Sequence, residues 1–299
     1  MVDRLRIALG TTFVGSDAPF IPEIDAVAPE NGGLLLIDAV NQLAPFPAGP
    51  PTHGAVLTNL LREQASALLG VDPDTLDPVQ QVVNMTSTYG KVERTPRGGI
   101  HSIQSTAQTT ANEGYLIPNP NNIVAWMKSN PTHAFYFSVW NKPTRLATAS
   151  PITDIFAGAI ESSANSYALS MGTITPATFG PTSVTSHNDN RGTNNTPQLS
   201  AQTVQGLPVD FTGQPTVLGR YGLFDNGNFL TPNRVSGRLG KRGARVFYRA
   251  FLEDLTVSGR SEETVYALDL EEYTQQVLTP GGHYYGDTVP TDPATYPTT

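Results

Sequence analysis

The sequence predicts a mainly β protein with a few short helices, and three observations support this prediction. The chain of 299 residues contains 27 glycines and 25 prolines, which interrupt it often. Its polarity comes mostly from Thr, Ser, Asn and Gln, because only 15% of the residues are charged. Several short runs combine aromatic and β-branched residues, which fit a pleated, half-buried surface. This mixture favours short strands and many turns over long helices.

Several segments have strand-like patterns, among them residues 146–150, 166–171 and 218–230. Residues 5–14 partly alternate between polar and apolar side chains, and residues 34–37 form a short apolar run typical of a buried strand. Residues 133–140 are dense in aromatic and β-branched side chains and predict a central strand. Residues 244–259 form a second, longer strand-like run. Residues 86–110 are rich in Thr, Ser and Gln and predict strands with exposed faces.

Three segments predict helices. Apolar residues recur at helical spacing across residues 55–69, with Thr52 as the expected N-terminal cap. Gly70 follows at the position where a helix commonly ends. A short helix is expected over residues 121–127, and a longer one over residues 261–278. We expect the helix over residues 55–69 to pack its apolar face on the rest of the fold.

The remaining sequence predicts loops and a soft division into parts. Residues 187–196 are rich in Asn and Thr and predict a long surface loop. The chain is expected to divide into an N-terminal part, residues 1–110, and a second part, residues 111–290. Residues 291–299 form an extended Pro/Thr tail. Such a tail buries little, so it either moves freely or lies against a neighbouring chain.

Charge and composition exclude several classes of function. The formal net charge of −8 argues against sequence-independent binding of nucleic acid, which needs a concentrated basic face. The one basic cluster, residues 234–249, lies on strand-forming sequence and is interpreted as solvated surface charge, with a contact to a glycan, a phosphate group or a partner as the alternative. The chain has no cysteine, which excludes disulfides and thiolate metal sites. We expect no membrane insertion and no signal peptide, because no apolar run is long enough.

Glu253 and Asp254 are the most prominent candidate pair of catalytic carboxylates. Many glycosidases use two carboxylates that flank a sugar bond. Neighbouring residues on a strand point to opposite faces, however, so these two side chains are not expected to meet one substrate. The five histidines have no zinc-like spacing, and no phosphate-binding loop or nucleophile elbow is present. We therefore expect no enzymatic activity and no cofactor.

Two Asn-rich segments carry weak candidates for binding calcium. Asp225 and Asp189 lie among Asn and Gly residues that supply the oxygen ligands Ca²⁺ prefers. The run that contains Asp225 is equally typical of a hairpin turn in which Gly227 adopts positive φ. The sequence therefore predicts no metal site at either position.

Aromatic residues are the remaining candidates for recognition. Trp126 and Trp140 lie inside apolar runs, which favours a place in the core. A planar ring with a polar edge suits stacking on a sugar, and it suits a protein interface equally well. Four residues are predicted to contact a glycan or a partner chain: Tyr221, His283, Tyr284 and Tyr285.

Three segments together resemble one family. They are residues 121–126 with the strand through Trp140, residues 218–221, and residues 244–288, which end in Gly-Gly-His-Tyr-Tyr-Gly-Asp-Thr. In this combination the chain resembles minor tail proteins of bacteriophages that contain a concanavalin-like, or laminin-G-like, jelly roll. The resemblance implies an antiparallel β-sandwich over residues 111–290. It places the aromatic segments near 135 and 247 face to face in two packed sheets.

The resemblance also implies a function. Such a protein is made in the host cytoplasm and becomes a structural part of the virion, in the tail tip or baseplate. Its expected partners are other tail proteins, further copies of itself and, for some such modules, host-surface glycans. One alternative is a polysaccharide-degrading enzyme on the same fold, which needs two carboxylates converging within about 5–10 Å. Another is a protein that decorates the capsid surface, which differs from the first only in location.

Overall fold

The computed structural model describes residues 25–105, 107, 113–146, 155–161, 167–172, 184–187, 195–207, 222–227 and 243–296. Within these ranges the fold is mainly β, with antiparallel sheets and a few short helices, as the sequence predicts. The strands are β1 (Gly33–Asp38), β2 (Gln81–Val83), β3 (Gly90–Arg94), β4 (Ile100–Gln104), β5 (Gly114–Pro118), β6 (Ala134–Arg145), β7 (Ile155–Glu161), β8 (Tyr167–Gly172), β9 (Val184–His187), β10 (Gln198–Gln205), β11 (Gly222–Gly227) and β12 (Ala244–Asp254). The α-helices are α1 (Arg62–Leu69), α2 (Asn121–Ser129), α4 (Leu255–Ser258) and α5 (Glu262–Tyr273). Shorter turns are the 3-10 turns η1 (Pro73–Leu76) and η5 (Pro293–Thr295) and the π-helical turn η4 (Thr274–Leu278).

The largest sheet has seven strands and is organised around β12. Its path is β3-β4-β12-β6-β10-β9, and β1 pairs with β12 off this path. The first half of β12 pairs with β4 and its second half pairs with β1, while β6 follows the other edge along the whole strand. Strands from residues 33–104 and from residues 134–254 therefore share one sheet.

The expectation that the segments near 135 and 247 lie face to face is wrong. β6 and β12 are neighbours in the same sheet, with Val139 opposite Ala250 and Phe137 opposite Leu252. The sheet is covered on both sides, so every residue of β12 is buried and most residues of β6 are buried as well. A run of this kind predicts burial, but it does not tell whether two such strands pair or stack.

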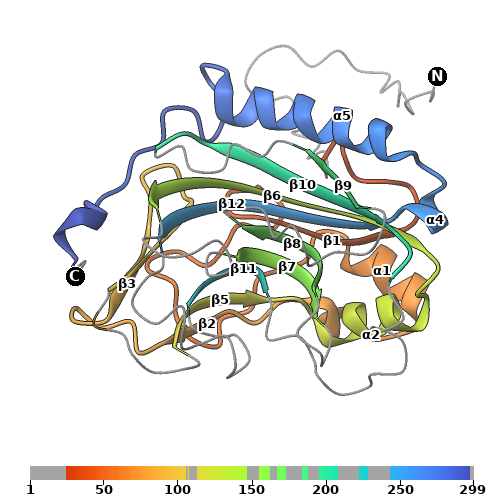
Figure 1. The fold of residues 1–299 in the computed structure, drawn as a ribbon, viewed down its shortest axis with the longest axis horizontal. Helices are drawn as coiled ribbons and strands as arrows, with labels where there is room; N and C mark the ends of the chain where they lie inside the picture. The colour runs from red at the N-terminus through yellow and green to blue at the C-terminus, as the bar shows by residue number, and fades with distance from the viewer. Residues whose placement is uncertain are drawn as a thin grey trace, which may run out of the picture.

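The fold is layered, with the seven-stranded sheet in the middle (Figure 1). Helix α5 covers one face, where Trp140, Tyr273 and Tyr284 belong to one buried cluster. The three-stranded sheet β11-β5-β2, the β7-β8 pair and helices α1 and α2 lie on the other side. The largest core fills the space between these layers, where the rings of Phe224 and Phe247 lie 5.3 Å apart.

Helix α1 begins later than the sequence predicts. The predicted helix covers residues 55–69, but α1 starts at Arg62, and its N-cap Leu61 makes no side-chain cap, so Thr52 does not cap it. The preceding segment is held instead by Asn59, whose side-chain oxygen accepts bonds from the main-chain N–H groups of Leu36 and Leu61. The predicted helix end is confirmed, because Gly70 adopts a left-handed conformation with φ of 70°.

The remaining predicted elements agree with the structure in part. β10 pairs with β6 along its whole length, although no strand was predicted over its residues. β4 is buried throughout, which contradicts the exposed faces predicted for residues 86–110. The predicted helices at residues 121–127 and 261–278 are confirmed as α2 and as α5 with η4. Residues 5–14 lie outside the described residues.

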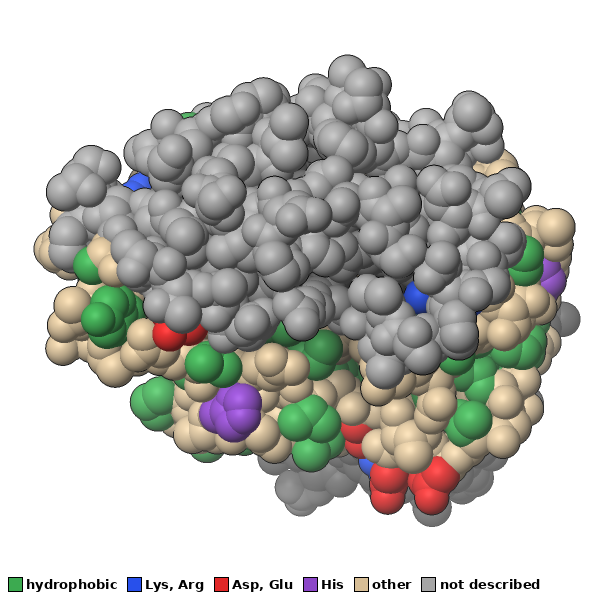
Figure 2. Space-filling model, turned by 60° about the horizontal axis from the view of Figure 1, so that its bottom comes forward, with side chains coloured by type: hydrophobic (Ala, Val, Ile, Leu, Met, Phe, Trp, Pro, Cys, Tyr) green, Lys and Arg blue, Asp and Glu red, His purple; other side chains and the backbone are tan. Residues whose placement is uncertain are grey.

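The surface of the described part carries scattered apolar groups. Its most exposed large hydrophobic side chains include Val56, Leu278 and Leu43. Where Figure 2 shows described residues, hydrophobic side chains lie as separate groups among polar ones. No helix among the described residues is both long and apolar enough to cross a bilayer.

Candidate functional site

The predicted contact residues separate into a buried anchor and two exposed side chains. Tyr284 is only 1% exposed, and its hydroxyl donates to Asp38 Oδ1 at 2.7 Å. Its ring lies 4.5 Å from that of Tyr248, so it fastens the loop that follows η4 to the sheet. Tyr285 and His283 are exposed on the same loop. The predicted contact role therefore rests on these two, since Tyr221 lies outside the described residues.

The weak calcium candidates are not brought together by the described structure. Asp225 lies in strand β11, opposite Leu116 of β5, and not in the hairpin turn that its sequence suggested. Asp189 lies outside the described residues. Within the described ranges, no cluster of three or more His, Asp and Glu side chains is arranged to hold a metal ion.

Glu253 and Asp254 face opposite sides of β12, as the alternation of a strand predicts. Glu253 accepts from Arg260 Nε at 2.9 Å, just before helix α5. Asp254 Oδ2 accepts from Trp126 Nε1 at 3.0 Å and lies 2.8 Å from His133 Nδ1. The other oxygen of Asp254 caps helix α4. Each carboxylate thus ties β12 to a different element, and the pair does not converge on one point.

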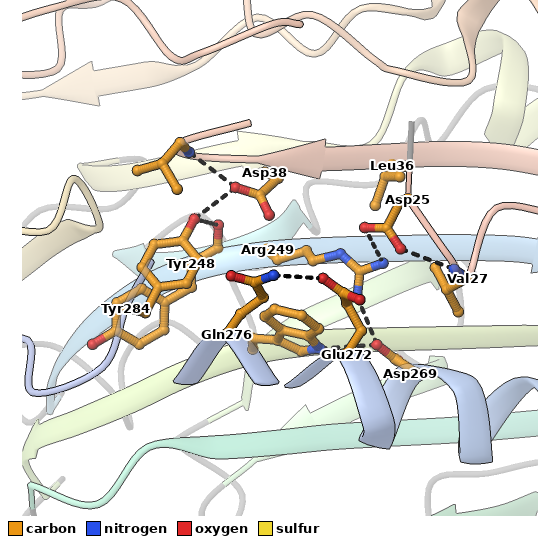
Figure 3. A network of polar contacts seen from close by, with 12 residues as sticks. Asp25, Val27, Leu36, Asp38, Tyr248, Arg249, Asp269, Glu272, Gln276 and Tyr284 are labelled. Carbon is orange, nitrogen blue, oxygen red and sulfur yellow. Dashed lines mark hydrogen bonds and ion pairs between the residues drawn. The ribbon is translucent and has the colours of Figure 1, made fainter. Parts of the chain in front are cut away.

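A buried carboxylate–arginine cluster lies between β12 and α5 (Figure 3). Arg249 is completely buried, with Nη1 2.6 Å from Asp269 Oδ1 and Nη2 2.9 Å from Asp25 Oδ2. Its guanidinium carbon lies 4.3 Å from the centre of the Trp140 ring. Asp269 of α5 also accepts from Trp140 Nε1 and from the Tyr136 hydroxyl, both at 2.9 Å. One aspartate therefore fixes the helix to two strands.

This cluster corrects the interpretation of the basic segment 234–249. Arg245 and Arg249 are 1% and 0% exposed, and are not solvated surface charges. They belong to β12, which is covered on both faces, so each is buried by the layer that it faces. Arg234, Arg238, Lys241 and Arg242 lie outside the described residues.

Burial shifts the pKa values of the cluster, in which the charges do not balance. Burial alone would lower the pKa of Arg249, but the attraction of Asp25 and Asp269 raises it overall. One guanidinium faces two carboxylates, so the second negative charge is poorly compensated. Burial raises the pKa of Asp25 to about 6, against the opposing effect of Arg249. Burial, together with Asp269, also raises the pKa of Tyr136 well above its usual range.

A second polar group lies at the other end of the same sheet. His101 is fully buried, with Nδ1 3.0 Å from Glu93 Oε1 and Nε2 2.9 Å from Thr144 Oγ1. Burial lowers the pKa of His101, although Glu93 opposes this, so the ring is neutral at pH 7. A carboxylate only accepts, so Nδ1 carries the proton and Nε2 accepts from the Thr144 hydroxyl.

The order hydroxyl, imidazole, carboxylate is that of a catalytic relay. Here, however, Thr144 keeps only 8% of its surface exposed and the imidazole keeps none. The three side chains come from β3, β4 and β6, so their bonds tie these strands together. The sequence did not mark this group. A hairpin centred on Arg97 places Glu93 directly opposite His101, and the turn at residues 95–99 was the available signal.

The C-terminal segment lies across this end of the sheet, and we call residues 287–296 the strap. Beneath it, Glu93, His101, Val246 and Lys142 are directly opposite one another on four adjacent strands. They form one row across the sheet, which we call the strap-facing row. The strap makes hydrogen bonds to Glu93 and Lys142 of this row.

The strap therefore differs from the tail that the sequence suggested. Thr291 donates through its N–H and its hydroxyl to the two oxygens of Glu93, at 3.0 and 2.8 Å. Lys142 Nζ donates to the carbonyl of Asp287 at 2.7 Å, and Arg145 Nη1 donates to that of Pro293 at 3.0 Å. These residues lie against their own chain.

Comparison with known proteins adds no family to this description. No protein-family model matches the chain, and a search of curated proteins finds no match.

Proposed function

We propose that this chain is a structural component of a bacteriophage particle, a minor tail protein of the tail tip or baseplate. The observation that carries the proposal is the use of its charged side chains. Arg249 and Asp254 are buried and each connect segments that are distant in sequence, Arg249 with Asp25 and Asp254 with Trp126, while the buried Glu253 holds Arg260, seven residues further along the chain. Such groups make a rigid block, which is what an assembly part requires.

The proposal includes a concanavalin-like jelly roll as the finer description of the fold. The stacking of the seven-stranded sheet and the β11-β5-β2 sheet around one apolar core supports it. The antiparallel pairing of all strands within these sheets supports it as well. The resemblance of residues 121–140 and 244–288 to phage tail modules gives the virion context.

The surface beyond α5 is the part that we assign to assembly contacts. Leu278, at the end of η4, is 48% exposed, and Tyr285, in the loop that follows, is 39% exposed. Leu270 of α5 lies two helical turns before Leu278 and is also exposed. Exposed aromatic and aliphatic side chains of this kind suit a neighbouring tail protein, a further copy, or a host-surface glycan.

Quantitative mass spectrometry of purified particles tests the assignment. Heads and tails are separated, and the copy number of this chain is measured in each fraction. We expect several copies per tail and none in the heads. Recovery only in the head fraction would favour a capsid decoration protein instead, and absence from both fractions would contradict a virion role.

A polysaccharide-degrading enzyme is the alternative with a direct assay. It would need two carboxylates on one substrate, whereas Glu253 and Asp254 point to opposite faces and each holds a structural partner. The assay measures reducing sugar released from host cell-wall polysaccharide by the purified protein. Release that Glu253→Gln abolishes, in a variant that is still folded, would replace our proposal with this one.

A further inference from the structure

The strap lies on the sheet as a bound peptide lies on its binding site. We propose that the strap-facing row is a binding site for residues 287–296, and that it accepts the strap of a second copy in place of its own. The occupant is a segment whose bound form is seen here within one chain. The inference concerns recognition between identical chains, so it stands or fails independently of the tail assignment.

The row, together with Lys91 and Arg145 on its two outer strands, recognises both the main chain and particular side chains of the strap. Lys142 and Arg145 each donate to a strap carbonyl, which any extended peptide offers. Glu93 is more selective, because one of its oxygens accepts from the Thr291 hydroxyl. Lys91 completes this contact by donating to the same hydroxyl. The site therefore distinguishes threonine at this position from an apolar residue of the same shape.

The apolar contribution to strap binding is small. Within the strap, Asp287 and Pro293 are buried and Val289 is half-buried, while most other positions are exposed. Val289 packs beside the cluster that contains Val246. Because polar bonds dominate, the strap can leave its site without uncovering a large apolar surface. Opening of this kind leaves the core beneath α5 in place.

A hinge separates the strap from the rest of the molecule. Gly286 has a φ of 69°, a conformation that glycine adopts without strain, and the space beside its Cα is open. Tyr284, two residues before Gly286, is anchored by its hydroxyl to Asp38. The strap can therefore swing about Gly286 while the preceding loop stays fixed.

Exchange between copies follows from these features. A strap that swings out makes the same bonds to the row of a neighbour as it made to its own, which is the low-cost route of domain swapping. In an isolated chain the strap binds its own row in preference to that of another copy, because the covalent connection gives the strap an effective concentration in the millimolar range. In an assembly, neighbouring copies reach comparable local concentrations, and exchange becomes competitive.

The test uses the full-length chain and a fluorescent peptide with the sequence of residues 287–296. Thr291→Asp in the full chain places a carboxylate against Glu93, which weakens the chain's own strap and frees the row. We expect this variant to bind the peptide at least about tenfold more tightly than the wild type by fluorescence anisotropy, because the competing strap is removed. The control Thr288→Asp changes an exposed threonine of the same strap and should behave like the wild type.

A second peptide tests selectivity at the site itself. A peptide that carries Thr291→Val keeps the main-chain bonds and loses the hydroxyl. It should therefore bind the Thr291→Asp protein more weakly than the peptide with the wild-type sequence does. The proposal is overturned if folded Thr291→Asp protein, checked by circular dichroism, binds no more tightly than the wild type. Equal binding of the two peptides would also overturn it. If Thr291→Asp does not fold, Thr291→Val in the full chain weakens the same contact and takes its place.

Discussion

Replacement of Asp25 by asparagine should change how the stability of the protein depends on pH. The pKa of Asp25 is raised from 3.8 to about 6 by burial in the cluster around Arg249. A carboxyl whose pKa is raised on folding stabilises the fold when protonated, and this contribution is lost as pH rises. Between about pH 4 and pH 6, only the unfolded chain gives up this proton. The free energy of unfolding should therefore fall across this window.

The magnitude follows from the size of the shift. About two pKa units at 1.36 kcal/mol each correspond to about 3 kcal/mol. Asparagine resembles the protonated acid and does not titrate, so the unfolding free energy of the variant does not fall for this reason as the pH rises. The unfolding free energy of Asp25→Asn minus that of the wild type should rise by about 3 kcal/mol from pH 4 to pH 7.

Urea denaturation of both proteins at several pH values between 3.5 and 8 measures this difference. The exposed Glu30 offers a matched control, because Glu30→Gln removes one negative charge outside the cluster. The difference between Glu30→Gln and the wild type should show no comparable rise. A difference for Asp25→Asn that stays flat across the range would refute the reasoning that Arg249 leaves one carboxylate uncompensated.

Three further predictions concern single side chains. Arg249→Met should destabilise the protein by about 3–5 kcal/mol in urea denaturation, because Asp269 then stays buried without its cation. A loss under about 1 kcal/mol would show that the pair contributes little. Tyr284→Phe should cost about 1–3 kcal/mol, because Asp38 loses a buried donor. An unchanged thermal midpoint would contradict this anchor role. Tyr285→Ala should leave the thermal midpoint unchanged and reduce incorporation into particles, and full incorporation would remove Tyr285 from the contact surface.

Local features of this fold were predictable from the sequence. The end of helix α1 depends on the backbone freedom of Gly70, and β6 and β12 depend on the composition of their own residues. These properties lie within a short window of the chain. The start of α1 was missed because Asn59 holds the preceding segment to β1, a contact that no local pattern shows.

Pairing and burial were not predictable in the same way. The charge of Arg249 suggested an exposed position, but Asp269 of α5 and Asp25, which no local pattern brings to it, compensate its charge in the buried cluster. The pairing of β6 with β12 depends on contacts far apart in the sequence, and the apolar pattern is the same whether strands pair or stack. The opposition of Glu93 and His101 was accessible in principle, since the turn between them fixes the hairpin register.

Electron cryomicroscopy of the intact particle tests the central claim most directly. If the chain is a tail building block, density at the tail tip or baseplate should fit the seven-stranded sheet with α5 on one face, in several symmetry-related copies. Density for this fold on the capsid surface, or its absence from a particle resolved well enough to trace every strand, would contradict the claim.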